Sequence, residues 1–234
     1  MYQFGTAVLA GLTAIAASVA GPSTPAEDQQ RADDAIAVFS ARLDRAGFRS
    51  TGAPDEEFVS ACLGGLDNPS RLAELAGETA RSVSDSWIFV PPDAEVASAT
   101  EIMSAAVFTV DALNVNPLDD LVALVGSSEA VDCKRAEYLT PPAGPDATFP
   151  PDMALPVLQF GTATALGPGD ESARFDMHVA FEAGGERYTF SYSTLVAVTG
   201  RSLVVVWLGF AGDGPYAGVD PQLELAALVV SLTS

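Results

Sequence analysis

The sequence predicts an α+β protein in which helices pack on one face of an antiparallel sheet and a single disulfide joins two parts of the chain. Three observations predict this class. Stretches near the C-terminus alternate apolar and polar residues, as half-buried strands do. Other stretches repeat apolar residues at helical spacing. The 234 residues are 48% hydrophobic and 18% charged, which is enough apolar material for a core and unlike a disordered chain.

The chain opens with an uncharged apolar run over residues 5–20 that ends in small residues. The tripeptides at 18–20 and 24–26 fit the small-x-small pattern of signal-peptide cleavage. We therefore expect residues 1–26 to be a signal peptide and the protein to be extracellular or in the cell envelope, although no basic residue precedes the run. An uncleaved anchor is the alternative, and the run is shorter than the roughly 20 residues of a membrane span.

The first half of the remaining chain, residues 27–135, is expected to be mainly helical. Thr24 and Glu27 form a capping box that starts the first helix, and Gly47 ends it. The elements expected here are helices over 24–47, 55–63 and 68–83, strands over 87–90 and 102–110, and a short helix that begins at Asn116 and carries Asp119 and Asp120 in its first turn.

A proline-rich connector over 140–156 leads to the second half, and both halves are expected to form one domain over 27–234. Residues 157–234 predict a sheet and a final helix. The expected elements are a hairpin with strands over 173–182 and 187–198, a strand over 203–210, and a helix that begins at Asp220. The strand over 203–210 is apolar on both faces, which predicts a central strand covered on both sides.

The charge of the chain excludes several partners. There are 31 acidic and 11 basic residues, which give a net charge of −20. Such a surface repels the phosphates of nucleic acids and the headgroups of anionic lipids. We therefore predict neither nucleic-acid binding nor peripheral binding to an anionic membrane. An unknown small molecule or an envelope protein remains as partner, and solubility alone also explains the acidity.

Two cysteines, Cys62 and Cys133, are far apart in the sequence. They form no Cys-x-x-Cys motif, and the single histidine, His178, cannot complete a Cys/His metal site. No metal or cofactor is therefore predicted. In an exported chain these cysteines predict a disulfide that closes a loop of about 70 residues. Two free thiols in a cytosolic protein are the alternative.

No catalytic residue is predicted. A Ser/His/Asp site would need His178, which lies on the polar side of an expected strand, and the chain has no Gly-x-Ser-x-Gly elbow. Glycine-rich phosphate loops are missing too. Adjacent acids such as Asp33 and Asp34 point to different sides of a helix, which favours a solvated face over an acid/base pair. The alternative is a secreted hydrolase with a carboxylate-based site.

Aromatic side chains are the candidates for ligand contacts. Tyr188 and Tyr192 share a face of one expected strand, Trp207 lies on the next strand, and Trp87 lies on an earlier one. Aromatic-lined concavities are common in binding sites. We predict a cleft between the sheet and the helices that several of these four residues line, while an ordinary core would use the same residues.

One pattern in the second half resembles a known family. It consists of Leu155-Pro156, the turn Gly169-Asp170-Glu171-Ser172, a hairpin, the segment Val198–Val206 and a closing helix. This pattern resembles the C-terminal half of actinobacterial extracytoplasmic sensor-like proteins, similar to the extracellular domain of PknH-type receptor kinases and to related secreted lipoproteins.

The resemblance covers about residues 150–234 and implies an α+β domain with a ligand-binding cleft beside the sheet. It implies a secreted, non-catalytic ligand-binding or sensor-like envelope protein whose ligand is unknown. The chain departs from the family in having two cysteines where the kinase sensor has two disulfides, and in lacking a lipobox and a kinase domain. A structural protein-interaction module of the envelope is a further alternative.

Overall fold

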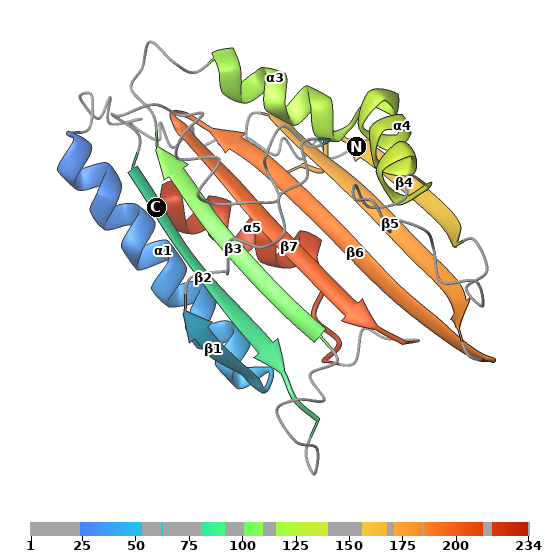
Figure 1. Ribbon diagram of the computed structural model, residues 1–234. Helices are drawn as coiled ribbons and strands as arrows, with labels where there is room; N and C mark the ends of the chain where they lie inside the picture. The colour runs from blue at the N-terminus through green and yellow to red at the C-terminus, as the bar shows by residue number, and fades with distance from the viewer. Residues whose placement is uncertain are drawn as a thin grey trace, which may run out of the picture.

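A computed structural model describes residues 24–52, 62, 81–91, 101–109, 116–139, 156–167, 171–183, 185–212 and 217–233. In this part of the chain, seven antiparallel strands form one sheet in the order β1-β2-β3-β7-β6-β5-β4 (Figure 1). The strands are β1 (Phe48–Gly52), β2 (Arg81–Phe89), β3 (Glu101–Thr109), β4 (Val157–Thr164), β5 (Glu171–Ala183), β6 (Glu186–Thr199) and β7 (Ser202–Ala211). The helices are α1 (Pro25–Arg45), α3 (Asn116–Val125), α4 (Ser128–Leu139) and α5 (Pro221–Thr233).

The α+β class and the antiparallel sheet are confirmed. The predicted helices at both ends of the chain, the short helix from Asn116, the hairpin and the central strand all form. β1, β4 and α4 were not predicted. The helix expected over 68–83 is wrong at its end, because Val83 lies in β2. The connector over 140–155 and the helix over 55–63, apart from Cys62, lie outside the described residues.

The first half of the chain is less helical than predicted. It contributes β1, β2 and β3, and β3 pairs along its whole length with β7 from the second half. Strands from both halves therefore belong to one continuous sheet. The physical reason is that β3 and β7 are both buried over consecutive residues, Ala105–Thr109 and Leu203–Leu208, and pairing the two strands satisfies the backbone groups that this burial removes from water.

Helix α1 begins where the sequence predicts. The backbone N–H of Glu27 donates to Thr24 Oγ1 at 3.3 Å, and the backbone N–H of Thr24 donates to Glu27 Oε2 at 2.7 Å. This reciprocal pair satisfies two N–H groups that have no partner within the helix. The hydrogen bond from the Thr24 backbone holds the pKa of Glu27 below its ordinary value.

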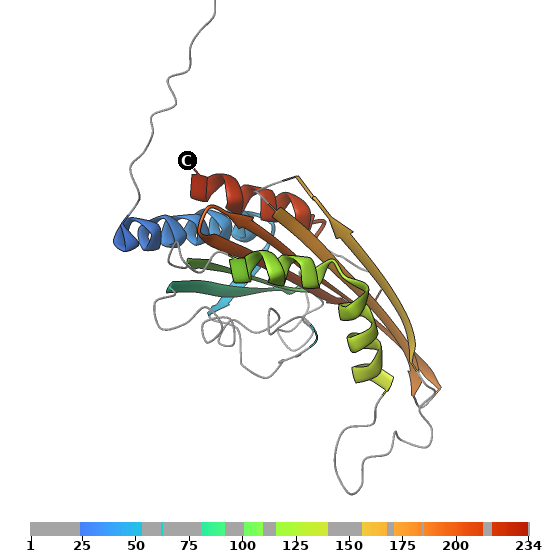
Figure 2. The ribbon, with the colours of Figure 1, turned by 90° about the horizontal axis from the view of Figure 1, so that it is seen from above.

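Two apolar cores lie on opposite faces of the sheet. In the first core, α1 and α5 pack against β2, β3, β6 and β7. In the second core, α3 and α4 pack against β3, β5, β6 and β7. Figure 2 shows the two pairs of helices on the two sides of the sheet. The prediction that all helices pack on one face is therefore wrong.

The sequence of β7 gives the physical reason. Val204 and Val206 point into the first core, and Leu203 and Val205 point into the second. Because successive side chains of a strand point to opposite faces, an unbroken apolar strand needs cover on both sides. Helices on one face would have left half of these side chains in water.

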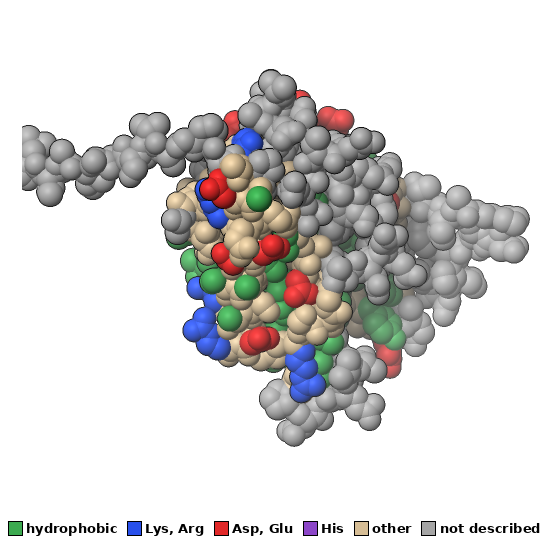
Figure 3. All heavy atoms as spheres, turned by 90° about the vertical axis from the view of Figure 1, so that its left-hand side faces the viewer, with side chains coloured by type: hydrophobic (Ala, Val, Ile, Leu, Met, Phe, Trp, Pro, Cys, Tyr) green, Lys and Arg blue, Asp and Glu red, His purple; other side chains and the backbone are tan. Residues whose placement is uncertain are grey.

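An ion pair joins the two helices of the first core. Arg42 of α1 donates from Nε and Nη2 to the two carboxylate oxygens of Glu224 in α5, at 2.9 and 2.8 Å. These hydrogen bonds raise the pKa of Arg42 above its ordinary value. Such a bidentate contact fixes both the distance and the relative orientation of the two helices. Around α1 and β1 the surface carries carboxylates and arginines interspersed (Figure 3).

The predicted disulfide between Cys62 and Cys133 is confirmed. The two Cα atoms are 5.3 Å apart, and the bond ties Cys62 to helix α4. Disulfides persist in oxidising compartments, so this bond is typical of an exported protein. None of the helices in the described part is long and apolar enough to span a membrane.

Candidate functional site

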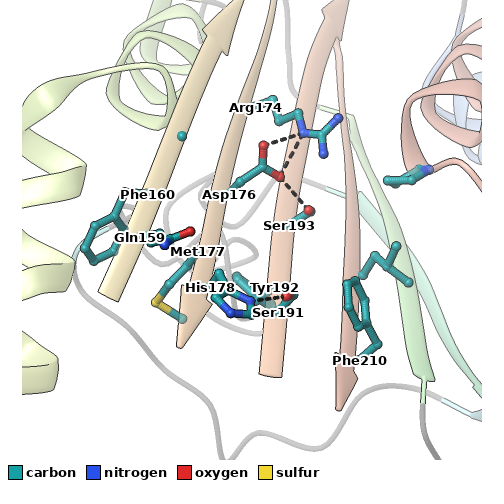
Figure 4. Close-up of a pocket in the computed structure, with 13 residues that line it drawn as sticks. Gln159, Phe160, Arg174, Asp176, Met177, His178, Ser191, Tyr192, Ser193 and Phe210 are labelled. Carbon is teal, nitrogen blue, oxygen red and sulfur yellow. Dashed lines mark hydrogen bonds and ion pairs between the residues drawn. The ribbon is translucent and has the colours of Figure 1, made fainter. Parts of the chain in front are cut away.

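One corner of the sheet lies outside the cover of the described helices. On the face of the first core, α5 packs on β6 and β7, and α1 packs on β1, β2 and β3, while β4 and β5 contribute no residue to that core. A groove of about 410 Å³ occupies this corner and ends at Pro221, the first residue of α5 (Figure 4). Its lining residues are Gln159, Phe160, Gly161, Arg174, Asp176, Met177, His178, Ser191, Tyr192, Ser193, Leu208, Phe210 and Pro221.

Strand alternation builds the polar floor of the groove. Arg174, Asp176 and His178 are two residues apart on β5, so they share one face. Asp176 lies between two donors: Arg174 Nε donates to Oδ1 at 2.8 Å, and Ser193 Oγ of β6 donates to the same oxygen at 2.5 Å. Figure 4 shows this carboxylate held between the arginine and the serine. These contacts fix the three side chains before any ligand arrives.

The histidine of the groove has a serine partner. His178 Nδ1 and Ser191 Oγ are 2.8 Å apart, and the two residues oppose each other on β5 and β6. A serine nucleophile needs a histidine that is itself held by a third group. Among the described residues no carboxylate hydrogen-bonds to His178, because Asp176 is engaged by Arg174 and Ser193. Within the described part of the chain, this pair therefore has no third member of a triad.

Acid/base hydrolysis of glycosides fits the groove equally poorly. That chemistry uses two carboxyl groups on either side of the bond that breaks. Within the described lining, Asp176 is the one carboxylate. Nor does the described part of the chain hold any group of three His, Cys, Asp or Glu side chains that could bind a metal ion. What the groove offers is a set of oriented donors and acceptors.

The wall of the groove toward the first core is apolar. Leu208 and Phe210 of β7 line it together with Pro221. Met177 and Tyr192 also contribute to the lining, although their side chains pack against the second core on the other face. An apolar wall next to a few polar groups is the usual composition of a small-molecule site.

The four aromatic residues predicted from the sequence do not meet in one place. Trp87 is fully buried in the first core, where its Nε1 donates to Ser40 Oγ at 3.2 Å. Trp207 is buried in the second core, on the opposite face. Both tryptophans thus occupy positions that an ordinary core explains.

The two tyrosines differ from each other. Tyr188 is 45% exposed and stacks on Phe181, with ring centroids 5.4 Å apart. Its hydroxyl donates to Glu186 at 2.9 Å, and this hydrogen bond raises the pKa of Tyr188. Tyr192 lines the groove. Of the four predicted residues, the structure brings one to the groove, and contact with a ligand stays a prediction for all of them.

The polar floor was not identified from the sequence. The alternation over 173–182 and 187–198 predicts only that Arg174, Asp176, His178, Ser191 and Ser193 lie on the polar side of the hairpin. One signal was present: a histidine, an acid and an arginine alternate on one strand, and two serines alternate on the next. Their pairing across the hairpin follows from the antiparallel register of β5 and β6, in which His178 lies opposite Ser191 and Asp176 opposite Ser193.

Comparison with known proteins adds little. No family model matches the chain, and no curated protein matches it. Among solved structures, one similar chain is LpqN, a protein involved in cell envelope biogenesis of Mycobacterium tuberculosis. The match has 10% sequence identity, covers 58% of this chain and 74% of that chain, and has a TM-score of 0.29. A likeness at this level carries no argument about function, and membership of the sensor-like family stays a prediction.

Proposed function

We propose that this chain is an exported, non-catalytic protein that binds a small molecule in the groove over β4, β5, β6 and β7. The observation that carries the proposal is the polar floor, whose side chains are held by mutual hydrogen bonds in a place that no helix of the first core covers. The volume of about 410 Å³ lies within the range of ligand sites, which is roughly 300–1,000 Å³.

The side chains of the polar floor favour binding because their hydrogen bonds already hold them in place, so the ligand does not have to order them. Ordering a free side chain on binding costs about 0.5–1.5 kcal/mol. Asp176 and Ser193 are already fixed to each other, and His178 is fixed to Ser191. All of them stand on strands of one sheet. A ligand that matches this arrangement therefore loses little affinity to reorganisation.

The charges of the floor indicate what kind of ligand fits. Arg174 and Asp176 neutralise each other, with a shortest nitrogen–oxygen distance of 2.7 Å. The chain as a whole carries a net charge of −20, which repels anions. Leu208 and Phe210 offer an apolar wall beside the polar floor. We infer a ligand without large net charge that has hydrogen-bonding groups on one side and an apolar part on the other.

Export is supported by two independent features. The N-terminal segment has the apolar run and the small residues of a signal peptide. The Cys62–Cys133 disulfide requires an oxidising environment to persist. The groove would therefore bind its ligand outside the cytoplasm.

The experiment starts from small molecules that copurify with the secreted, oxidised protein. They are extracted under denaturing conditions, identified by mass spectrometry, and titrated back by calorimetry and by amide NMR. Arg174→Ala removes a floor residue, and Arg187→Ala removes an exposed arginine of the same hairpin that does not line the groove. We expect Arg174→Ala to weaken binding by roughly tenfold or more, the loss of a charged hydrogen bond, while Arg187→Ala leaves it unchanged.

Two results would contradict the proposal. One is a ligand whose NMR shift changes map away from β4, β5, β6 and β7. The other is equal weakening by Arg174→Ala and Arg187→Ala, because such a loss would reflect overall charge and not the groove.

A further inference from the structure

The two edges of the sheet are built differently. β1, at one edge, has five residues, contains Arg49, and has an irregular register between Ser50 and Gly52. Short length, charge and bulges are the devices that keep a sheet edge from pairing with another chain. The side of the molecule at this edge shows both acidic and basic side chains (Figure 3).

β4, at the other edge, has none of these devices. Its eight residues, VLQFGTAT, contain no charged residue and no proline. The register with β5 runs without a break from Val157 to Thr164. Val157 is 61% exposed. A regular, uncharged, exposed edge of this length is the kind that pairs with a further strand.

The ladder shows which backbone groups of β4 are available. The N–H of Ala165 donates to the carbonyl of Ser172 at 2.8 Å, which marks these residues as a hydrogen-bonded pair. In an antiparallel ladder such pairs alternate with pairs that do not exchange hydrogen bonds. Counting back along the unbroken register, the odd-numbered residues of β4 bond to β5. The backbone groups of Leu158, Phe160, Thr162 and Thr164 therefore point outward, where no described strand pairs with them.

We propose that β4 pairs antiparallel with β4 of a second copy of this chain, about a two-fold axis at Gly161. This axis sets Phe160 opposite Thr162 of the second copy and Leu158 opposite its Thr164, so all four outward residues form hydrogen-bonded pairs. Other axes leave some of them unpaired. Because β1 is short, charged and irregular, it does not pair with a further strand, so the assembly closes as a dimer with one continuous sheet and does not grow into a fibre.

Charge favours a second copy at this strand. Each copy carries a net charge of −20, so two copies repel over most of their surfaces. At β4 neither copy brings a charge, and two neighbouring arginines are each paired with an acid: Arg135 with Asp132, and Arg174, opposite Ala163, with Asp176. The uncharged edge is therefore the place where two acidic copies approach at least cost.

The dimer would also extend the groove. Gln159 and Gly161 form the outer margin of the groove on β4. In the proposed register Ala163 of the second copy lies beside Gln159 on the same face, so the second copy adds a strand to the open side of the groove. The two grooves would then lie side by side across the axis.

The test uses the secreted protein with its disulfide intact. Sedimentation equilibrium over a range of concentrations should show a monomer and a dimer. Hydrogen exchange by NMR should show the amides of Leu158, Phe160, Thr162 and Thr164 protected only at concentrations where the dimer forms. Amides at 159, 161 and 163 should be protected throughout, because they bond to β5.

Variants identify the edge. Thr162→Glu places a charge at β4 in both copies, and Thr51→Glu makes the same change at the β1 edge; both threonines are exposed. We expect Thr162→Glu to weaken the dimer by roughly tenfold or more, since the symmetry repeats the change, and Thr51→Glu to leave it unchanged. Thr162→Pro removes an outward N–H and should act in the same direction; if that variant fails to fold, Thr162→Glu decides.

Three outcomes would overturn the proposal. One is a monomer at several hundred micromolar whose outward amides exchange freely. Another is a dimer that Thr162→Glu and Thr51→Glu weaken equally, which would place the interface elsewhere. The third is protection of the outward amides only when a different protein or peptide is added, which would make that molecule the occupant of the edge.

Discussion

Replacing Cys62 and Cys133 together by alanine should destabilise the protein by about 4 kcal/mol. The two residues are 71 positions apart in the sequence. Without the bond, the unfolded chain regains the freedom that a loop of this length loses on closure, which the chain-entropy model puts at about 4 kcal/mol. For a domain of this size, 1 kcal/mol shifts the melting temperature by about 2–4 °C, so we expect a fall of roughly 10 °C.

The assay is urea unfolding followed by tryptophan fluorescence, with calorimetry for the melting temperature. Oxidised wild type is compared with the double variant in the presence and absence of reductant. Reduced wild type should approach the stability of the double variant, and the double variant should not respond to reductant. Intact mass after alkylation without reductant should show no modified thiol in wild-type protein.

A loss of stability below about 1 kcal/mol would refute the reasoning, because the loop-closure term would then be absent or cancelled. Two alkylated thiols in freshly secreted protein would refute it more directly. That second result would also remove the main structural support for export.

Three further predictions concern ionisable groups. Arg42→Ala should lower the free energy of unfolding in urea by about 1–3 kcal/mol, because it leaves the buried Glu224 carboxylate unpaired. Adding Glu224→Gln to the same chain should recover part of the loss. No recovery would contradict the ion pair between these residues. The pKa of Glu27 is lowered in the folded protein, so the stability that its capping contact contributes is complete above the ordinary pKa of 4.5 and disappears as the pH falls through the lower folded pKa. The difference in stability between wild type and Glu27→Ala should therefore shrink between pH 7 and pH 3. A constant difference would argue against the capping contact. Glu186→Gln should lower the pKa of Tyr188 toward 10.0 in an NMR titration of the tyrosine ring, and an unchanged pKa would show that the hydrogen bond does not form in solution.

Where the strand and helix periods are strong, the sequence predicts the fold well. β5 and β6 follow from period-two alternation and a glycine turn, β7 follows from an unbroken apolar run, and α1 follows from a capping box and an apolar stripe. β4 and α4 lack such patterns. β4 is an edge strand in which only Leu158 and Phe160 pack against a core, and α4 buries only Ala130 and Lys134 among its residues with described burial. Neither element needs an apolar stripe, so periodicity does not reveal it.

The site was harder to predict because periodicity assigns a side chain to a face without telling what covers that face. Trp87 and Trp207 lie on strands as predicted, but each points into a core, Trp87 into the first and Trp207 into the second. His178 and Ser191 were correctly placed on the polar side of the hairpin. That this side forms a groove depends on where α5 begins relative to β5, which is a property of the tertiary packing and not of any local pattern.

The two faces of β5 have different surroundings, and this decides which substitutions the fold tolerates. Phe175, Met177 and Val179 hold the strand in the second core, while Arg174, Asp176 and His178 on its other side belong to neither core. Substitutions in the groove therefore remove few apolar contacts, and most should leave folding intact. Ligand preference can therefore vary while the packing of the second core stays the same, which makes the polar floor a natural position for engineering new binding specificities.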